Sequence, residues 1–275
     1  MDDLDSLLDL ASRLARDAGA LLLEGRASAR VDDDNVATKT SPTDLVSDMD
    51  RASEKLLVEG LAQARPDDAI LAEEGASREG SSGVRWVIDP LDGTINYLYG
   101  YPAWGVSIAA EVDGEGVVGV VYDPTRDELF SGVAGRGARC NDQTVRPSDA
   151  TDLSQSLVAT GFSYRPERRA RQARMLATVL PAVRDIRRMG AATLDLCWVA
   201  CGRVDAYYES GLQPWDLAAG AVIAAAAGAR VEGLEGPVPQ SGSVVAATPA
   251  LVDPLRALLD EARASSPSEL GDENG

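Results

Sequence analysis

Residues 86–96 read WVIDPLDGTIN, and this stretch decides how the rest of the chain is interpreted. Its apolar start predicts a strand that delivers Asp89 at its C-terminal end, with Asp92 three residues later. Gly93-Thr94 then opens a predicted helix. Two carboxylates on a tight turn suit divalent cations, which prefer oxygen ligands, and amides at a helix N-terminus bind anions such as phosphate. The alternative is a solvated turn, because Asp-Pro and Asp-Gly pairs also mark turns.

Three further acidic segments lie outward from this stretch. LAEEG at 71–75 places two acids after a short apolar run, and WD at 215–216 stands at the start of the most apolar helix. TDLVSDMD at 43–50 adds three acids beside Lys39. Taken singly, these segments have plain structural explanations: a solvated loop, an aspartate N-cap and a capped helix start. Their occurrence together favours a shared carboxylate site.

The composition excludes several classes of function. The 275 residues include 44 acidic and 26 basic side chains, a net charge of −18. This excess argues against a nucleic-acid backbone or an anionic membrane as the main partner. The chain has no histidine, which rules out Ser-His-Asp triads, Cys-His dyads, His-ligated zinc and a phosphohistidine intermediate. Polar chemistry therefore has to come from carboxylates, hydroxyls, amides, lysine or a metal ion.

Signals of location favour the cytoplasm. The first ten residues, MDDLDSLLDL, are acidic where a secretory signal is basic. The apolar run 217–229 is too short to span a bilayer. The 3 cysteines are odd in number and sparse, so they predict no disulfide framework and suit a reducing compartment.

The pattern of apolar residues predicts a mixed α and β domain with sheets covered by helices. The apolar residues of 4–24 recur at helical spacing, and a Ser47–Asp50 cap predicts the start of a second helix. A β meander is predicted over 104–136, with a turn at Asp113-Gly114. In the second half, strands are predicted at 156–160, 185–189, 204–209 and 243–246, and helices at 167–183, 193–201, 216–227 and 249–262. We expect one domain over 1–264, built of two closely packed halves of about 1–150 and 151–264, with a mobile loop around 32–35 and a disordered tail over 265–275.

Together and in this order, the acidic segments resemble the inositol monophosphatase family of metal-dependent sugar phosphatases. The stretches that carry the resemblance are KTSPTDLVSDMD (39–50), EEG (73–75), WVIDPLDGTINY (86–97), RRMGAATLDLCWVACGRVDAYYE (187–209) and WDLAAG (215–220). The pairing of D-P-x-D-G-T with W-D-x-A-A-G is highly specific, and the resemblance covers about residues 5–262. It implies a layered αβαβα sandwich, a homodimer, and hydrolysis of a phosphate monoester that depends on two or three Mg²⁺ ions and is inhibited by lithium.

The resemblance also implies a set of metal ligands. Glu73, Asp89 and the backbone carbonyl of Leu91 would hold the first Mg²⁺, and Asp89, Asp92 and Asp216 a second, with Glu73 near a third, weaker site. Such a cluster lowers the pKa of water and neutralises phosphate oxygens, so hydrolysis needs no histidine.

Roles in catalysis and substrate binding follow from the same resemblance. Thr94, hydrogen-bonded to Asp50, would help to deprotonate the attacking water beside Glu73, and Lys39 would lie on a mobile loop over the site. The amides of Gly93 and Thr94 would bind phosphate. The side of the site that faces the inositol hydroxyls would be formed by Asp92, Ala192, Glu209 and Asp216.

Two positions depart from the family pattern. Some relatives have a histidine shortly before W-D, where this chain has Gln213-Pro214, which leaves the contact to the sugar ring and the lithium sensitivity open. Tyr97 stands where phenylalanine is more usual, a change that we interpret as packing.

Other interpretations are weaker. Haloacid-dehalogenase-type phosphatases separate their two aspartates by one residue, whereas Asp89 and Asp92 have two between them. GVAGRG at 132–137 lacks the G-x-G-x-x-G spacing of dinucleotide sites, and Cys197 and Cys201 are read as helix residues rather than metal ligands. Three tryptophans are predicted in the core: Trp104, Trp198 and Trp215.

Two alternatives for function stay open at this stage. Histidinol phosphate, fructose 1,6-bisphosphate or 3′-phosphoadenosine 5′-phosphate could replace inositol 1-phosphate as the substrate. A non-catalytic regulator that retains the fold is the alternative from another class.

Overall fold

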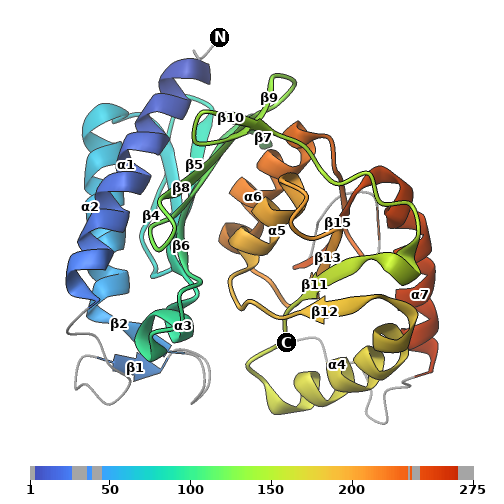
Figure 1. The fold of residues 1–275 in the computed structure, drawn as a ribbon. Helices are drawn as coiled ribbons and strands as arrows, with labels where there is room; N and C mark the ends of the chain where they lie inside the picture. Colours follow the sequence, from blue (N-terminus) through green and yellow to red (C-terminus); the bar gives the residue numbers. More distant parts are fainter. Residues whose placement is uncertain (1–3, 27–35, 39–44, 235, 237–241, 266–275) are drawn as a thin grey trace.

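Helices and sheets alternate in five layers, as the computed structural model shows (Figure 1). The structure describes residues 4–26, 36–38, 45–234, 236 and 242–265. One outer layer holds α1 (Leu4–Gly25) and α2 (Asp48–Ala64), and the central layer holds α5 (Ala192–Ala200) and α6 (Pro214–Ala227). The other outer layer holds α4 (Pro166–Val179) and α7 (Val252–Ala264), while the short α3 (Thr94–Tyr99) lies beside the first sheet. The predicted αβαβα sandwich is confirmed.

The larger sheet has eight strands and separates the α1–α2 layer from the central helices. β3 and β5 run parallel, and every other neighbouring pair is antiparallel. In spatial order the strands are β10 (Gln143–Val145), β9 (Gly137–Cys140), β8 (Glu128–Val133), β7 (Glu115–Asp123), β6 (Gly105–Val112), β5 (Val84–Asp92), β3 (Ala69–Ala72) and β4 (Ser77–Arg78).

The smaller sheet has five strands and packs between the central helices and the α4–α7 layer. β11 runs parallel to both of its neighbours, whereas β15 runs antiparallel to β13 and β14. The spatial order is β12 (Asp185–Arg187), β11 (Leu157–Thr160), β13 (Ala206–Ser210), β15 (Ser243–Ala247) and β14 (Arg230–Glu232). A separate pair joins β1 (Val36–Thr38) to β2 (Leu45–Ser47).

Local sequence explains several elements. The Ser47 hydroxyl caps α2 by accepting from the Asp50 amide, and Asp50 accepts in return from the Ser47 amide, so the predicted cap is a full capping box. Asp113 and Gly114 both have positive φ, of 52° and 85°, which matches the tight turn expected between β6 and β7.

Small residues let the apolar helix α6 lie directly on the large sheet. A Cβ at Gly119 of β7 would stand 2.3 Å from the carbonyl oxygen of Ala219, and one at Gly132 of β8 would stand 2.7 Å from the Cα of Ile223. Because protein interiors are close-packed, such a contact leaves no room for a larger side chain. This packing fixes the N-terminus of α6, and Asp216 with it.

The structure corrects several boundaries. The helix predicted over 167–183 ends at Val179 and passes into a 3₁₀ turn at Leu180–Ala182, because Pro181 disfavours helix at the residue before it. The short strands β3, β4, β9, β10 and β14 were not predicted as strands, since two to four residues carry little periodicity. The predicted loop around 32–35 and nearly all of the predicted tail lie outside the described residues.

The tryptophan prediction is fully confirmed for Trp104, which is 1% exposed, whereas Trp198 and Trp215 pack against the core but are only partly buried. Trp198 is partly buried, and the guanidinium groups of Arg126 and Arg203 lie over its ring, 5.3 and 5.4 Å from the ring centroid. Trp215 is partly buried in the first turn of α6 and lines a cavity. Among the described helices, none combines the length and the apolar character that crossing a bilayer requires.

Candidate active site

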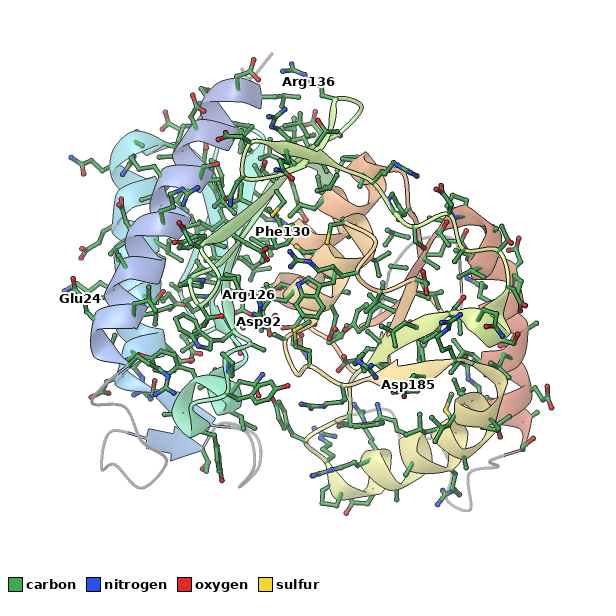
Figure 2. The ribbon with its side chains drawn as sticks, viewed as in Figure 1. Glu24, Asp92, Arg126, Phe130, Arg136 and Asp185 are labelled. Carbon is green, nitrogen blue, oxygen red and sulfur yellow. The ribbon has the colours of Figure 1, made fainter. Side chains whose placement is uncertain are left out.

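A cavity of about 640 Å³ lies where the two sheets and the central helices meet. Its walls come from both halves of the chain: the loop after β3, the end of β5 and the start of α3 on one side, and the loops after β11, β12 and β13 on the other. Asp92 lies between the large sheet and the central helices (Figure 2). Asn96 joins the two halves, since its amide donates to the carbonyls of Ala103 at 2.7 Å and Met189 at 2.9 Å.

A bulge in β5 brings the two aspartates of the opening stretch to the same side. The strand continues to Asp92 instead of ending at Asp89, but its register shifts: Asp89 pairs with Ser107 and Asp92 with Gly105. Two residues, Pro90 and Leu91, therefore stand opposite one. Residues three apart in a regular strand face opposite sides, and the extra residue of a bulge reverses this. Both carboxylates consequently line the cavity.

Neighbouring groups hold the acidic residues in place. Asp92 Oδ2 accepts from the Thr193 amide at 2.8 Å and from its hydroxyl at 2.6 Å. Asp216 Oδ2 accepts from the Gln213 amide at 2.6 Å. The loop that carries Glu73 is fixed by Glu54 of α2, which accepts from the amide of Glu74 at 2.8 Å.

Burial and mutual repulsion raise the pKa values of these carboxyls. The pKa of Asp89 lies well above its usual range because of burial, and then because of the charges of Glu73, Asp92 and Asp216. Burial raises the pKa of Asp92 to about 6, although the hydrogen bonds from Thr193 oppose the rise. The pKa of Asp216 is also well above its usual range, through burial and the charge of Asp92. A group of acids that resist ionisation in one cavity is typical of a functional site.

The donor set of this cavity fits hard divalent cations. Four carboxylates, those of Glu73, Asp89, Asp92 and Asp216, line the same cavity as Leu91, and oxygen is the ligand atom that Mg²⁺ prefers. Within the described residues, no three acidic or cysteine side chains are already arranged around one point as a metal ion needs. Asp89 instead forms a side-chain hydrogen bond with Glu73. Binding a cation therefore has to displace shared protons and draw the carboxylates together.

Beside the carboxylates, a buried chain of hydroxyl and carboxyl groups begins at Thr94. Its hydroxyl lies 2.7 Å from Asp50 Oδ1, to which it donates, and 3.1 Å from the carbonyl of Leu91. Asp50 is 0% exposed, and its other oxygen accepts from the Ser47 hydroxyl at 2.5 Å. The capping box of α2 thus orients the carboxylate that accepts the hydrogen bond from Thr94.

On the side of the cavity formed by the second half of the chain, the position of Glu209 depends on Tyr207, Arg188 and Gly161. The Tyr207 hydroxyl donates to its Oε2 at 2.7 Å, and the charge of Arg188 attracts it. Burial raises the pKa of Glu209 to about 7. Gly161, at the end of β11, leaves the space for the carboxylate: a Cβ there would stand 1.8 Å from Oε2.

Comparison with known proteins agrees with this geometry. The model of the inositol monophosphatase family matches residues 3–265. The chain belongs to the inositol monophosphatase family. It is 44% identical to the inositol-1-monophosphatase of Mycobacterium leprae, over 97% of each chain, and 42% identical to the Nus factor SuhB of Pasteurella multocida, over 90% of this chain and 94% of that protein. The solved structure of Mycobacterium tuberculosis SuhB, 42% identical, superposes with a TM-score of 0.81 over 96% of this chain and 99% of that one.

Most of the residues that the resemblance singled out do meet in this inositol monophosphatase cavity. The residues that line it include Glu73, Asp89, Leu91, Asp92, Gly93, Thr94, Ala192, Glu209 and Asp216. Asp50 stands behind Thr94, while Lys39 lies outside the described residues.

Sequence reasoning missed the groups that position these side chains: Thr193, Tyr207, Gly161, Gln213 as a backbone donor, Glu54 and Asn96. Gly161 lies against the side chain of Glu209, far from it along the chain, and the two come together through the parallel pairing of β11 with β13. The signal that was available is position along the chain: Asn96 and Thr193 both lie inside the stretches that carry the resemblance, 86–97 and 187–209, and Thr193 directly follows Ala192.

The raised pKa values predict how metal binding depends on pH. Asp92 and Glu209, with pKa values of about 6 and about 7, keep protons in the folded metal-free protein at pH values where the unfolded chain has lost them. The stability of the metal-free protein therefore falls as pH rises from about 4 to 7. A cation bound by Asp92 must displace the proton of that carboxyl, so its stabilising effect should grow over the same interval.

We expect Mg²⁺ at about 100 times its dissociation constant to raise Tm by about 5–10 °C at pH 8 and by little at pH 5. Thermal denaturation of the protein in EDTA and in Mg²⁺, from pH 5 to pH 8.5, measures this difference. If Mg²⁺ raised Tm by the same amount at pH 5 and at pH 8.5, proton displacement would not accompany metal binding.

Proposed function

We propose that this protein is a Mg²⁺-dependent phosphatase that hydrolyses a phosphate monoester of a sugar or polyol, with inositol 1-phosphate as the first candidate. The observation that carries the proposal is the meeting, in one cavity, of four carboxylates with the Thr94–Asp50 pair. Family membership supports phosphatase chemistry. The 44% identical relative named inositol-1-monophosphatase supports the choice of inositol 1-phosphate.

In this proposal the carboxylates hold two or three Mg²⁺ ions. Glu73, Asp89 and the Leu91 carbonyl would bind the first ion, Asp89, Asp92 and Asp216 a second, and Glu73 would also lie near a third. Bound divalent cations neutralise phosphate oxygens and lower the pKa of water. Positioning and charge stabilisation are the main requirements of phosphoryl transfer, so histidine is not needed.

The residues around the cations perform the remaining steps. The Thr94 hydroxyl accepts a proton from the attacking water as it passes its own to Asp50 Oδ1, and its 2.7 Å hydrogen bond fixes the direction of that transfer. The amides of Gly93 and Thr94 bind the phosphate, and Lys39, which lies outside the described residues, is a further proposed catalytic residue. Asp92, Ala192, Glu209 and Asp216 contact the hydroxyls of the polyol, where Glu209 in its ionised form accepts hydrogen bonds.

We also propose that the protein is a cytoplasmic homodimer and is inhibited by Li⁺. Three free cysteines, at positions 140, 197 and 201, agree with a reducing compartment.

Inhibition by Li⁺ is proposed at the second cation position. Asp89, Asp92 and Asp216 are hard oxygen ligands that suit a small cation, and Gln213-Pro214 beside them sets the sensitivity to Li⁺.

A metal-dependence assay tests the proposed function. Purified protein should release phosphate from inositol 1-phosphate with Mg²⁺ and lose that activity in EDTA, with recovery when Mg²⁺ is returned. Histidinol phosphate, fructose 1,6-bisphosphate and 3′-phosphoadenosine 5′-phosphate, compared by kcat/KM, rank the substrates. Undiminished turnover after exhaustive chelation would contradict the proposal.

A regulatory role is a second candidate, favoured by one observation. A relative that is 42% identical over 90% of this chain is named Nus factor SuhB. Absence of phosphatase activity on the whole substrate panel, with the protein folded and Mg²⁺ bound, would favour this role over the enzyme.

Replacement of Gly161 by alanine tests the placement of Glu209. The new Cβ would overlap the carboxylate, at 1.8 Å from Oε2 and 2.3 Å from Oε1, and would break its hydrogen bond from Tyr207. Since a hydrogen bond to a charged group contributes about 1.5–3 kcal/mol, KM for inositol 1-phosphate should rise at least about tenfold. Hydrolysis of p-nitrophenyl phosphate, which has no polyol hydroxyls, should change little.

A double-mutant cycle separates this effect from a general loss of structure. In the Glu209→Ala background, Gly161→Ala should raise KM no further, because the carboxylate that it displaces is gone. Additive effects of the two substitutions would show that Gly161 acts in another way.

A further inference from the structure

A buried hydroxyl lies on the large sheet behind the carboxylates of the cavity. Ser107 of β6 is 1% exposed, and within the described part of the chain its Oγ has no hydrogen-bond partner. Buried polar groups are nearly always paired, because a buried hydroxyl without a partner loses its hydrogen bonds to water and gains none in return. The folded chain therefore holds a serine here at a cost in stability that alanine would avoid.

The pairing of the strands places Ser107 directly opposite Asp89. In the antiparallel ladder of β5 and β6, the Cα atoms of these two residues are partners. Side chains that stand directly opposite each other lie on the same face of a sheet, with Cβ atoms about 4.5–5.5 Å apart. A serine hydroxyl and a carboxylate at that separation can reach hydrogen-bond distance by rotation of their side chains, without movement of the backbone.

The other neighbours of Ser107 on this face are apolar. On β7 its Cα partner is Val121, and two residues further along β6 Ala109 pairs with Val87. These three side chains belong to the hydrophobic core that the sheet forms with the central helices. Because none of them carries an acceptor, the hydroxyl at position 107 finds no partner on that side.

Two other buried acids of the sheet already have donors. Asp92, beyond the bulge, accepts from the amide and the hydroxyl of Thr193. Asp123 of β7 accepts from the amide and the hydroxyl of Thr125 at 2.9 and 2.6 Å, and from the guanidinium of Arg126 at 2.6 Å. Neither carboxylate depends on a further donor for its orientation.

Asp89, in contrast, has acceptor capacity to spare. Its Oδ1 accepts from the Leu91 amide at 3.0 Å, and it forms a side-chain hydrogen bond with Glu73. An ionised carboxylate has two oxygens and about four sites for donors or cations. Cation binding has to break the bond that Asp89 shares with Glu73. The Asp89 carboxylate then needs another contact to fix its orientation.

We propose that Ser107 is a positioning residue for the cation site, whose hydroxyl donates to Asp89 when a divalent cation is bound. This inference rests on the proposed Mg²⁺-dependent function and adds a residue behind the cavity wall, since Ser107 is not among the described residues that line the cavity. Removal of a group that holds a metal ligand from behind typically weakens metal binding by about 10- to 100-fold. The serine thus destabilises the protein without metal and stabilises the protein with metal.

Ser107→Ala should change stability and metal affinity in opposite directions. In EDTA its Tm should rise by about 2–4 °C, because alanine removes a buried hydroxyl that has no partner. The Kd for Mg²⁺, measured by isothermal titration calorimetry, should rise about tenfold, because Asp89 loses its donor. A serine that served packing alone would not produce this pair of opposite effects.

Ser156→Ala is the matched control. Ser156 is also buried, at 0% exposed, but its hydroxyl donates to the carbonyl of Asp152 at 2.8 Å, and it is not among the described residues that line the cavity. Its substitution breaks a hydrogen bond, so Tm should fall both in EDTA and in Mg²⁺, while the Kd for Mg²⁺ keeps its wild-type value. An equal change of Kd in both variants would trace the effect to the loss of any buried hydroxyl and overturn the positioning role.

The dependence of turnover on Mg²⁺ separates metal positioning from substrate binding. With inositol 1-phosphate as the substrate, the Mg²⁺ concentration that gives half of the maximal rate should rise in Ser107→Ala by the same factor as Kd. KM for inositol 1-phosphate at saturating Mg²⁺ should stay within about twofold of the wild type, because the hydroxyl lies behind the cavity wall. A rise in KM with an unchanged requirement for Mg²⁺ would contradict the proposal.

A crystal structure of the protein with Mg²⁺ tests the hydrogen bond itself. Ser107 Oγ should lie about 2.5–3.0 Å from an oxygen of Asp89, and a hydroxyl that still has no partner would overturn the proposal. If Ser107→Ala binds Mg²⁺ as tightly as the wild type, the positioning role fails and the proposed function stands. If the wild type binds Mg²⁺ but hydrolyses no substrate, the proposed function fails while calorimetry still decides the role of Ser107. A wild type that binds no Mg²⁺ would overturn both.

Discussion

Asp89→Asn should abolish both turnover and the stabilisation by Mg²⁺ while the protein stays folded. Asp89 is 1% exposed, stands beside the β5 bulge, and has a pKa raised by burial and by the charges of Glu73, Asp92 and Asp216. An amide in its place removes the one carboxylate that is assigned to both cations. We expect kcat to fall by more than about 1,000-fold, which corresponds to about 4 kcal/mol of transition-state stabilisation.

The same substitution should change stability in opposite directions with and without metal. In EDTA the variant should be at least as stable as the wild type, because it removes a buried carboxyl whose ionised form is repelled by three others. In Mg²⁺ the increase in Tm should be largely lost. Thermal denaturation in both buffers, together with phosphate release, measures the two effects.

Asp195→Asn is the control for Asp89→Asn. Asp195 is also a buried carboxyl with a raised pKa, caused by burial and by Glu209 and Asp92, but it is not among the residues that line the cavity. Its variant should keep the response to Mg²⁺. If Asp89→Asn retained turnover within about tenfold of the wild type, a loss below roughly 1.4 kcal/mol, the ligand assignment would be wrong.

The parts of this site that could be predicted from sequence are those encoded by neighbouring residues. The Ser47–Asp50 cap, the turn at Asp113-Gly114 and the order of strand, aspartates and helix over residues 86–99 depend on contacts within a few positions. Such elements can be predicted because the residues that form them also determine them, as a capping hydroxyl does at a helix start and residues that tolerate positive φ do in a tight turn.

The remaining features depend on partners that are distant in sequence. The bulge of β5 is a property of its pairing with β6, and the hydrogen bonds to Asp92 come from Thr193, 101 residues away. Gly161 matters only because β11 and β13 pair in parallel and bring Glu209 against it. Short strands such as β14, three residues long, have too few positions to show a period.

Thr94→Ala should separate water activation from metal binding. Thr94 is 8% exposed and its hydroxyl donates to Asp50 Oδ1 at 2.7 Å, while Asp50 is anchored by Ser47 at the start of α2. Because alanine cannot accept the proton of the attacking water, kcat should fall by about 100-fold or more, within the range of a positioned proton acceptor. The affinity for Mg²⁺ should change little, since the hydroxyl is not assigned as a principal ligand.

Two further variants establish that the effect belongs to the hydroxyl and its partner. Thr94→Ser keeps the donor and acceptor and should restore kcat to within about tenfold of the wild type. Asp50→Asn should resemble Thr94→Ala in kcat, because the amide cannot take the proton that Thr94 passes on. Steady-state kinetics give kcat and KM, and titration of Mg²⁺ followed by Tm gives the affinity. A change confined to KM in Thr94→Ala would assign the hydroxyl to substrate binding instead of to the chemical step.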